Sequence, residues 1–133
     1  MTSEVTYLGD LRTSSVHNNS GDTVISDAPL DNNGKGEAFS PTDAVANALA
    51  TCMFTIMGIK AAQLGIDLAN STADVTKHMQ SDPRMISKIE IVFHMKTVVD
   101  EKSKQILERA AKTCPVYLSL HSDIEKAVTF NWQ

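Results

Sequence analysis

Residues 40–65 read SPTDAVANALATCMFTIMGIKAAQLG, and this stretch decides the fold. Ser40, Pro41 and Asp43 have the form of a capping box, with the serine as N-cap, the proline at the first helical position and the acid in the first turn. The final glycine stands where many helices end on a left-handed residue. The pattern therefore predicts one long helix from Pro41 to Leu64.

Apolar and small side chains fall on every face of this predicted helix. It should therefore be buried all round, and a chain of 133 residues has little else to cover it. A membrane span competes with this interpretation, but Asn47, Thr51, Thr55 and Gly58 interrupt an apolar run that ends at Lys60, whereas a bilayer requires about 20 apolar residues. We therefore expect no membrane segment and a homodimer that shares the burial of the helix.

The residues before the helix have the pattern of short strands. Gly9-Asp10 and the turn-forming residues 18–21 break the segment into short apolar runs, which predicts an antiparallel meander. A loop-rich stretch from Asp27 to Phe39, containing a proline and two glycines, separates the meander from the helix.

Five further elements are expected after the helix. In the order strand, strand, helix, short helix, strand, they cover residues 66–80, 89–95, 100–113, 115–120 and 124–130. The turn residues Ser81-Asp82-Pro83-Arg84 join the two strands as a hairpin, and Asp100 offers the N-cap of the amphipathic second helix. The chain should form a single α+β domain over 1–133.

Composition argues against several classes of function. The net charge is −4 and the basic residues are dispersed along the chain, so there is no basic cluster that would bind a phosphate backbone. We therefore expect no nucleic-acid partner. The polar N-terminus carries Glu4 and lacks the apolar core of a secretory signal, which predicts a cytoplasmic location. His17, His78, His94 and His121 do not have metal-ligand spacing with the cysteines, so we expect no metal.

Two cysteines are present, too few for a disulfide scaffold. Cys52 lies mid-way along the predicted helix, where a free cysteine is most often a core residue. Cys114 precedes Pro115 and should cap a short helix, where amide groups, the helix dipole and the nearby Arg109 and Lys112 favour a thiolate. These local features predict that Cys114 is the more acidic thiol, and its distance from Cys52 stays open.

Three motifs resemble one known family. They are Gly34-Lys35-Gly36 before the capping box, Ala48-Leu49-Ala50-Thr51-Cys52 and Cys114-Pro115-Val116. Together they are similar to the osmotically inducible protein C and organic hydroperoxide resistance (OsmC/Ohr) family, and Tyr7 to Arg12 looks like the first strand pair of that family. The resemblance implies an OsmC-like α+β fold, with antiparallel sheets around a long central helix in an intertwined dimer.

The resemblance also implies a thiol-dependent peroxidase without a bound cofactor. The Cys52 thiolate would attack an organic hydroperoxide of the fatty-acid type, and Cys114 would condense with the resulting sulfenic acid to a disulfide. An external dithiol or dithiol protein would reset the pair. Arg12 is the expected cation beside the Cys52 thiolate, and Asp43 is the nearest acid to orient it. We take Cys52 as the nucleophile because a helix-end effect is small beside an arginine contact.

One position departs from the family pattern. Members with strong peroxidase activity tend to carry a glutamate directly after the helix-opening proline, where this chain has Thr42. Glu37 would replace it only if the loop folds back. This departure motivates a second hypothesis, a non-enzymatic dimer that binds small hydrophobic ligands or acts in the stress response. A Cys-His hydrolase is less favoured, because no nucleophile-elbow or protease signature surrounds either cysteine.

Overall fold

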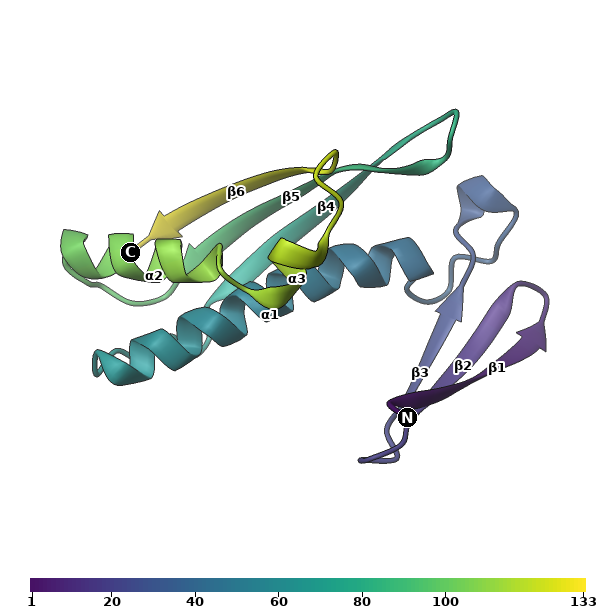
Figure 1. Cartoon of the computed structure of the whole chain (residues 1–133), viewed down its shortest axis with the longest axis horizontal. Coiled ribbons are helices and arrows are strands. Elements are labelled where there is room, and N and C mark those ends of the chain that lie inside the picture. The colour runs from purple at the N-terminus through teal and green to yellow at the C-terminus, as the bar shows by residue number, and fades with distance from the viewer. The chain divides into compact units, whose positions relative to one another are not determined.

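The computed structural model describes all 133 residues, and their contacts divide the chain into two compact units, Met1–Val45 and Ala46–Gln133. Each unit contains one three-stranded sheet (Figure 1). The helix α1 (Pro41–Gln63) begins in the first unit and continues in the second. The single domain expected over 1–133 stays a prediction.

The first unit is an antiparallel meander, as predicted. Its strands are β1 (Ser3–Gly9), β2 (Arg12–His17) and β3 (Thr23–Asp27), in the order β1-β2-β3. Asp10 and Leu11 form the tight turn between β1 and β2, and their φ angles are 53° and 61°. Two consecutive residues with positive φ match the right-handed twist of the flanking strands. The turn therefore sets the register of the first hairpin.

The second unit contains a mixed sheet in the order β4-β5-β6. β4 (Thr72–Gln80) and β5 (Met85–Met95) form the predicted antiparallel hairpin. β6 (Glu125–Trp132) instead pairs parallel to β5, which corrects the expectation of purely antiparallel sheets. The cause is the long connection through α2 (Glu101–Ala111) and α3 (Pro115–Ser119), because a crossover of this length can return the chain in the same direction.

The core of the second unit lies between this sheet and the helices. Alternate residues of β5 are fully buried, among them Ile89, Ile91 and Phe93. The Phe93 ring meets Phe54 of α1 edge-on, with 4.7 Å between centroids, and stacks on Phe130 of β6 at 5.1 Å. The helices α1, α2 and α3 all lie on this face of the sheet (Figure 1). Both cysteines belong to the same packed layer.

Helix α1 begins at the predicted residue and ends one residue before the predicted Leu64. The capping box forms, since the Asp43 N–H donates to Ser40 Oγ and the Ser40 N–H donates to Asp43 Oδ2, each at 3.0 Å. Gly65 follows the helix with a φ of 69°. One face is buried, through Ala46, Leu49, Ala50, Met53, Met57 and Ala61.

The opposite face of α1 is open to solvent within one chain, in line with the expectation that 133 residues cannot cover this helix on all sides. Its burial by a second copy stays a prediction. Ile59 is 56% exposed and Val45 is 37% exposed. The physical reason is that one sheet and two short helices cover only one side of a 23-residue helix. By length and composition alone this helix would also be able to cross a membrane, a test that core helices of soluble proteins pass too.

The first strand after α1 begins later than expected, whereas the cap of α2 lies where the sequence places it. Residues 66–71 form a connection without regular structure, so the strand predicted from residue 66 begins at Thr72. The cap of α2 is as predicted, since Asp100 accepts a hydrogen bond from the Ser103 N–H at 3.3 Å.

Candidate active site

The two cysteines occupy different environments in the second unit. Cys52 lies on α1 and is half-buried, whereas Cys114 is the N-cap of α3 and is fully buried. Both thiols are free. Cys52 is therefore the sulfur that a dissolved molecule can reach, and Cys114 is shielded by the core.

Cys114 has the predicted capping geometry but not the predicted acidity. Its Sγ accepts a hydrogen bond from the Tyr117 N–H at 3.3 Å, and Pro115 opens the helix behind it. Burial nevertheless raises the pKa of the Cys114 thiol, and interaction with the Cys52 thiol raises this pKa further. The expectation that capping favours the thiolate of Cys114 is therefore wrong, because desolvation outweighs the amides of Tyr117 and Val116 and the small dipole of a five-residue helix.

The two cysteines belong to the same packed cluster of the second unit. The Cys52 side chain raises the pKa of the Cys114 thiol, so the two groups are close enough to influence each other. Helices α1 and α3 bring them together on the inner face of the β4-β5-β6 sheet. A pair of adjacent thiols of which one is reachable and one is buried is suited to reversible oxidation to a disulfide.

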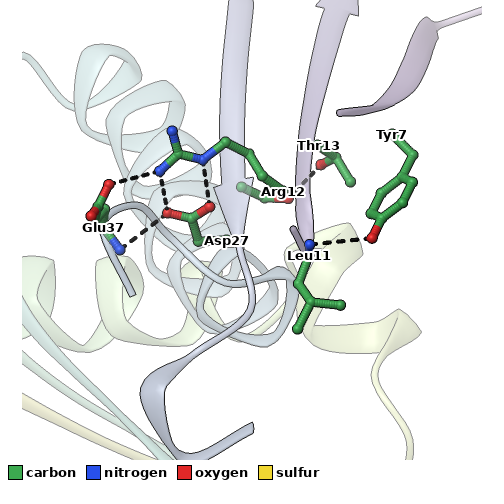
Figure 2. Close-up of polar contacts among 7 residues, drawn as sticks. Tyr7, Leu11, Arg12, Thr13, Asp27 and Glu37 are labelled. Atoms are coloured by element: carbon green, nitrogen blue, oxygen red, sulfur yellow. Dashed lines mark hydrogen bonds and ion pairs between the residues drawn. The ribbon is translucent and has the colours of Figure 1, made fainter. Parts of the chain in front are cut away.

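Arg12 lies in the first unit at the start of β2, where it forms an ion-pair cluster with two carboxylates (Figure 2). Its Nε and Nη2 donate to the two oxygens of Asp27 at 2.7 and 2.9 Å, a bidentate arrangement. Nη2 also donates to Glu37 Oε2 at 2.9 Å. The Glu37 N–H donates to Asp27 Oδ2 at 3.1 Å, so the three residues form one network.

The network fixes the charge and the direction of the arginine. Asp27 is buried, yet the hydrogen bonds from Arg12 hold the pKa of its carboxyl below the ordinary value against the effect of burial. The same contacts raise the pKa of Arg12, which therefore stays protonated. Nη1 is the terminal nitrogen of Arg12 that neither carboxylate occupies (Figure 2).

The loop before α1 folds back and places Glu37 in contact with Arg12 and Asp27. The Gly36 N–H donates to the carbonyl oxygen of Ala28 at 3.2 Å, which closes the loop on its own start. Gly34 packs so closely that a Cβ there would lie 1.7 Å from the Ala28 oxygen. Asp43, the acid expected to orient Arg12, instead closes the capping box of α1.

Sequence reasoning missed Asp27, although a signal for it existed. Residues 18–21 were identified as a turn, and a hairpin centred on them places residue 27 opposite residue 12. The register observed between β2 and β3 is this one, with Arg12 paired to Asp27. An arginine and an aspartate on opposite strands are expected to pair.

The histidines form local contacts rather than a cluster. His94 contacts Asp74 at 2.9 Å and His78 contacts Glu90 at 3.3 Å, both across β4 and β5. No group of three or more potential metal ligands forms. The absence of a metal stays a prediction.

The family model for OsmC-like proteins matches residues 34–128. The chain belongs to the OsmC-like family. This stretch includes both cysteine motifs and the whole of α1. The predicted family and the α+β OsmC-like fold are thereby confirmed. No curated protein sequence matches the chain.

Solved structures resemble this OsmC-like chain over nearly its full length. A Psychrobacter arcticus protein, named for osmotic stress induction and a detoxification response, is 51% identical, with a TM-score of 0.96 over 98% of this chain and 96% of that one. An OsmC-like protein from Mycoplasma pneumoniae is 17% identical, with a TM-score of 0.81 over 98% and 94%. An organic hydroperoxide resistance protein from Legionella pneumophila is 14% identical, with a TM-score of 0.73 over 98% and 97%. The two distant structures support the fold alone.

Proposed function

We propose that this OsmC-like protein is a cysteine peroxidase that reduces organic hydroperoxides to alcohols in the stress response. The observation that carries the proposal is the pairing of a reachable Cys52 with a buried Cys114. Membership of a family with organic hydroperoxide resistance proteins supports the same chemistry. The cycle uses the two sulfurs and an external dithiol, with no bound cofactor.

In the first step the Cys52 thiolate attacks the terminal oxygen of the hydroperoxide. The sulfur–oxygen bond forms as the oxygen–oxygen bond breaks, the alkoxide takes a proton and leaves as an alcohol, and Cys52 becomes a sulfenic acid. The Cys114 sulfur then attacks the Cys52 sulfur, so that a disulfide forms and water leaves. A dithiol finally returns two electrons and two protons to the pair.

The environments of the two sulfurs support this division of roles. The raised pKa of Cys114 keeps its thiol protonated, and two adjacent thiols do not readily carry two negative charges. A neutral, buried Cys114 is suited to the second step of the cycle, and the more exposed Cys52 to the attack on the hydroperoxide. Burial also keeps Cys114 from reacting with hydroperoxide itself.

Arg12 belongs to the first unit and Cys52 to the second, so its role rests on the family resemblance, from which we propose Arg12 as the cation that stabilises the Cys52 thiolate. Its Nε and Nη2 are held by Asp27 and Glu37, which leaves the two donors of Nη1 for an anion. The two carboxylates perform the orienting task that the family glutamate would perform at Thr42. With these two carboxylates in place, the absence of a glutamate at position 42 gives less support to the hypothesis of a non-enzymatic, ligand-binding dimer.

We further propose that the working form is a cytoplasmic homodimer. The open face of α1 carries the exposed Ile59, and the first sheet exposes Val5, Tyr7 and Val24, so both units present apolar side chains that a second copy would cover. Light scattering during size-exclusion chromatography tests this. A mass of twice the 14.5 kDa chain is expected, and a stable monomer at micromolar concentration would refute the dimer.

Consumption of hydroperoxide tests the peroxidase. Wild-type protein, Cys52→Ser and Cys114→Ser are each mixed with cumene hydroperoxide and dithiothreitol, and the remaining peroxide is measured over time. Cys52→Ser should lose the activity, and Cys114→Ser should retain the first step but turn over more slowly. An unchanged rate in Cys52→Ser would exclude the mechanism, and no consumption by the wild type would favour the ligand-binding dimer.

A further inference from the structure

A lysine of β6 reaches the short helix that carries Cys114. β6 follows α3 after a short connection, residues 120–124 (Figure 1). Lys126 pairs in register with the fully buried Ile89 of β5, so its side chain starts on the inner face of the sheet, where α3 packs. A lysine on this face needs partners for its ammonium group, because burial of an unpaired charge is costly.

The partners of Lys126 are two carbonyl oxygens and one aromatic ring. Its Nζ donates to the carbonyl oxygen of Ile124 at 3.2 Å and to that of His121 at 3.4 Å, both in the connection after α3. The same Nζ lies over the Tyr117 ring, 5.4 Å from its centre, which is within the range of a cation–π interaction. One ammonium group therefore joins β6, the connection and α3.

Tyr117 links this contact to the sulfur of Cys114. Its backbone N–H donates to Cys114 Sγ at 3.3 Å, while its ring contacts the lysine. α3 has only five residues, too few for a helix to keep its form in water by its own hydrogen bonds. Its placement therefore depends on outside contacts, which are the apolar ones of Val116 and Leu120 with the core and the polar one of Lys126.

We propose that Lys126 is a positioning residue for the second step of the cycle, in which Cys114 closes the disulfide with Cys52. The lysine acts through Tyr117, because by holding α3 it keeps the Cys114 sulfur in place for a bond of about 2 Å. Such a reaction within one chain is sensitive to the orientation of its two groups. The attack on the hydroperoxide uses Cys52 of α1 and does not involve α3. The role in the cycle rests on the proposed function, whereas the effect on disulfide closure does not.

The separate rates of the two steps test this role. Wild type, Lys126→Met and Lys126→Arg are mixed with one equivalent of cumene hydroperoxide, quenched with acid at intervals and analysed by intact-protein mass spectrometry. In Lys126→Met the reduced form should disappear at the wild-type rate, but the disulfide should form about tenfold more slowly, so the form with one added oxygen accumulates. Lys126→Arg keeps a charge that donates and stacks, so closure within about threefold of the wild-type rate is expected.

Two results would overturn the inference. One is closure at the wild-type rate in Lys126→Met. The other is an equal slowing of both steps, or loss of the wild-type circular dichroism spectrum, since the lysine would then support the whole unit rather than α3.

Two further variants identify the contact. Tyr117→Leu removes the ring and leaves the lysine, so it should slow closure as Lys126→Met does, and the double variant should be no slower than the slower single one. Fully additive slowing would overturn the route through Tyr117. Lys88→Met is the matched control, because Lys88 of β5 lies on the opposite face of the same sheet and contacts Glu125 at 3.6 Å. Its closure rate should equal that of the wild type.

Oxidation by diamide separates this inference from the peroxidase. One thiolate adds to the N=N bond of diamide, and the second sulfur then displaces the hydrazine, so that a disulfide forms as diamide takes up two electrons and two protons. In Lys126→Met the diamide adduct should accumulate because closure is slow. That result without hydroperoxide consumption by the wild type would refute the peroxidase and uphold the positioning role. Hydroperoxide consumption by the wild type, with unchanged closure in Lys126→Met for both oxidants, would uphold the peroxidase and overturn the positioning role.

Discussion

Asp27→Asn tests the orienting role of the carboxylates on Arg12. The substitution keeps the shape of the side chain but removes its charge and turns one of its two acceptors into a donor. Of the three hydrogen bonds that hold the guanidinium, the two to Asp27 span 2.7 and 2.9 Å, and only the 2.9 Å bond to Glu37 is left untouched. The 3.1 Å bond that ties the Glu37 N–H to Asp27 is weakened as well. Arg12 should therefore turn away from its present direction.

A misdirected catalytic group typically lowers the rate by one to two orders of magnitude, so kcat/KM for cumene hydroperoxide should fall about 10- to 100-fold in Asp27→Asn. Glu37→Gln removes the charge from one exposed contact and leaves an oxygen that can still accept from Arg12, so a loss of no more than about threefold is expected. Asp22→Asn, an exposed change in the turn between β2 and β3, is the matched control. The pH profile of Cys52 alkylation in a Cys114→Ser background gives a second readout, and it should shift to higher pH in Asp27→Asn alone. Wild-type values of both quantities in Asp27→Asn would refute this reasoning.

Three further predictions concern the thiol, the loop and the core. Because burial raises the pKa of Cys114, the folded chain keeps a thiol proton at a pH at which the unfolded chain loses it. The free energy of unfolding of the reduced protein should therefore fall as pH rises above the ordinary thiol pKa of about 8.5. Cys114→Ala should flatten this fall, as measured by urea denaturation between about pH 8 and 10. Gly34→Ala should lower the melting temperature measured by circular dichroism and release Glu37, because its Cβ collides with the Ala28 backbone oxygen; unaltered melting would contradict the close approach. Phe93→Ala should lower the free energy of unfolding by about 3–5 kcal/mol in the same urea assay, and a loss below about 1 kcal/mol would contradict its central place in the core.

The elements that sequence predicts well are those with local signals. The capping box at Ser40 and Asp43, the left-handed Gly65 and the N-cap at Asp100 each depend on residues within one turn, and all appear as expected. The turn at residues 18–21 likewise fixes the register that pairs Arg12 with Asp27, so the sequence alone is sufficient to predict this pair.

What sequence could not provide depends on contacts between distant segments. The parallel pairing of β6 with β5 results from how α2 and α3 return the chain, and no local pattern encodes this direction. The pKa of Cys114 is raised, whereas the capping position and the nearby cations predict that it is lowered. The cause is the burial of Cys114, which depends on the packing of the whole core. The open face of α1 shows the same limit, since an apolar pattern does not say whether its own chain or a second one covers it.

Intact-protein mass spectrometry after one equivalent of cumene hydroperoxide tests the central claim, the oxidation of Cys52 and its capture by Cys114. The wild type should lose the mass of two hydrogens and regain it with dithiothreitol, Cys114→Ser should gain one oxygen, and Cys52→Ser should not change. Wild-type protein that keeps both thiols, or Cys52→Ser that oxidises as readily as the wild type, would contradict the two-cysteine account.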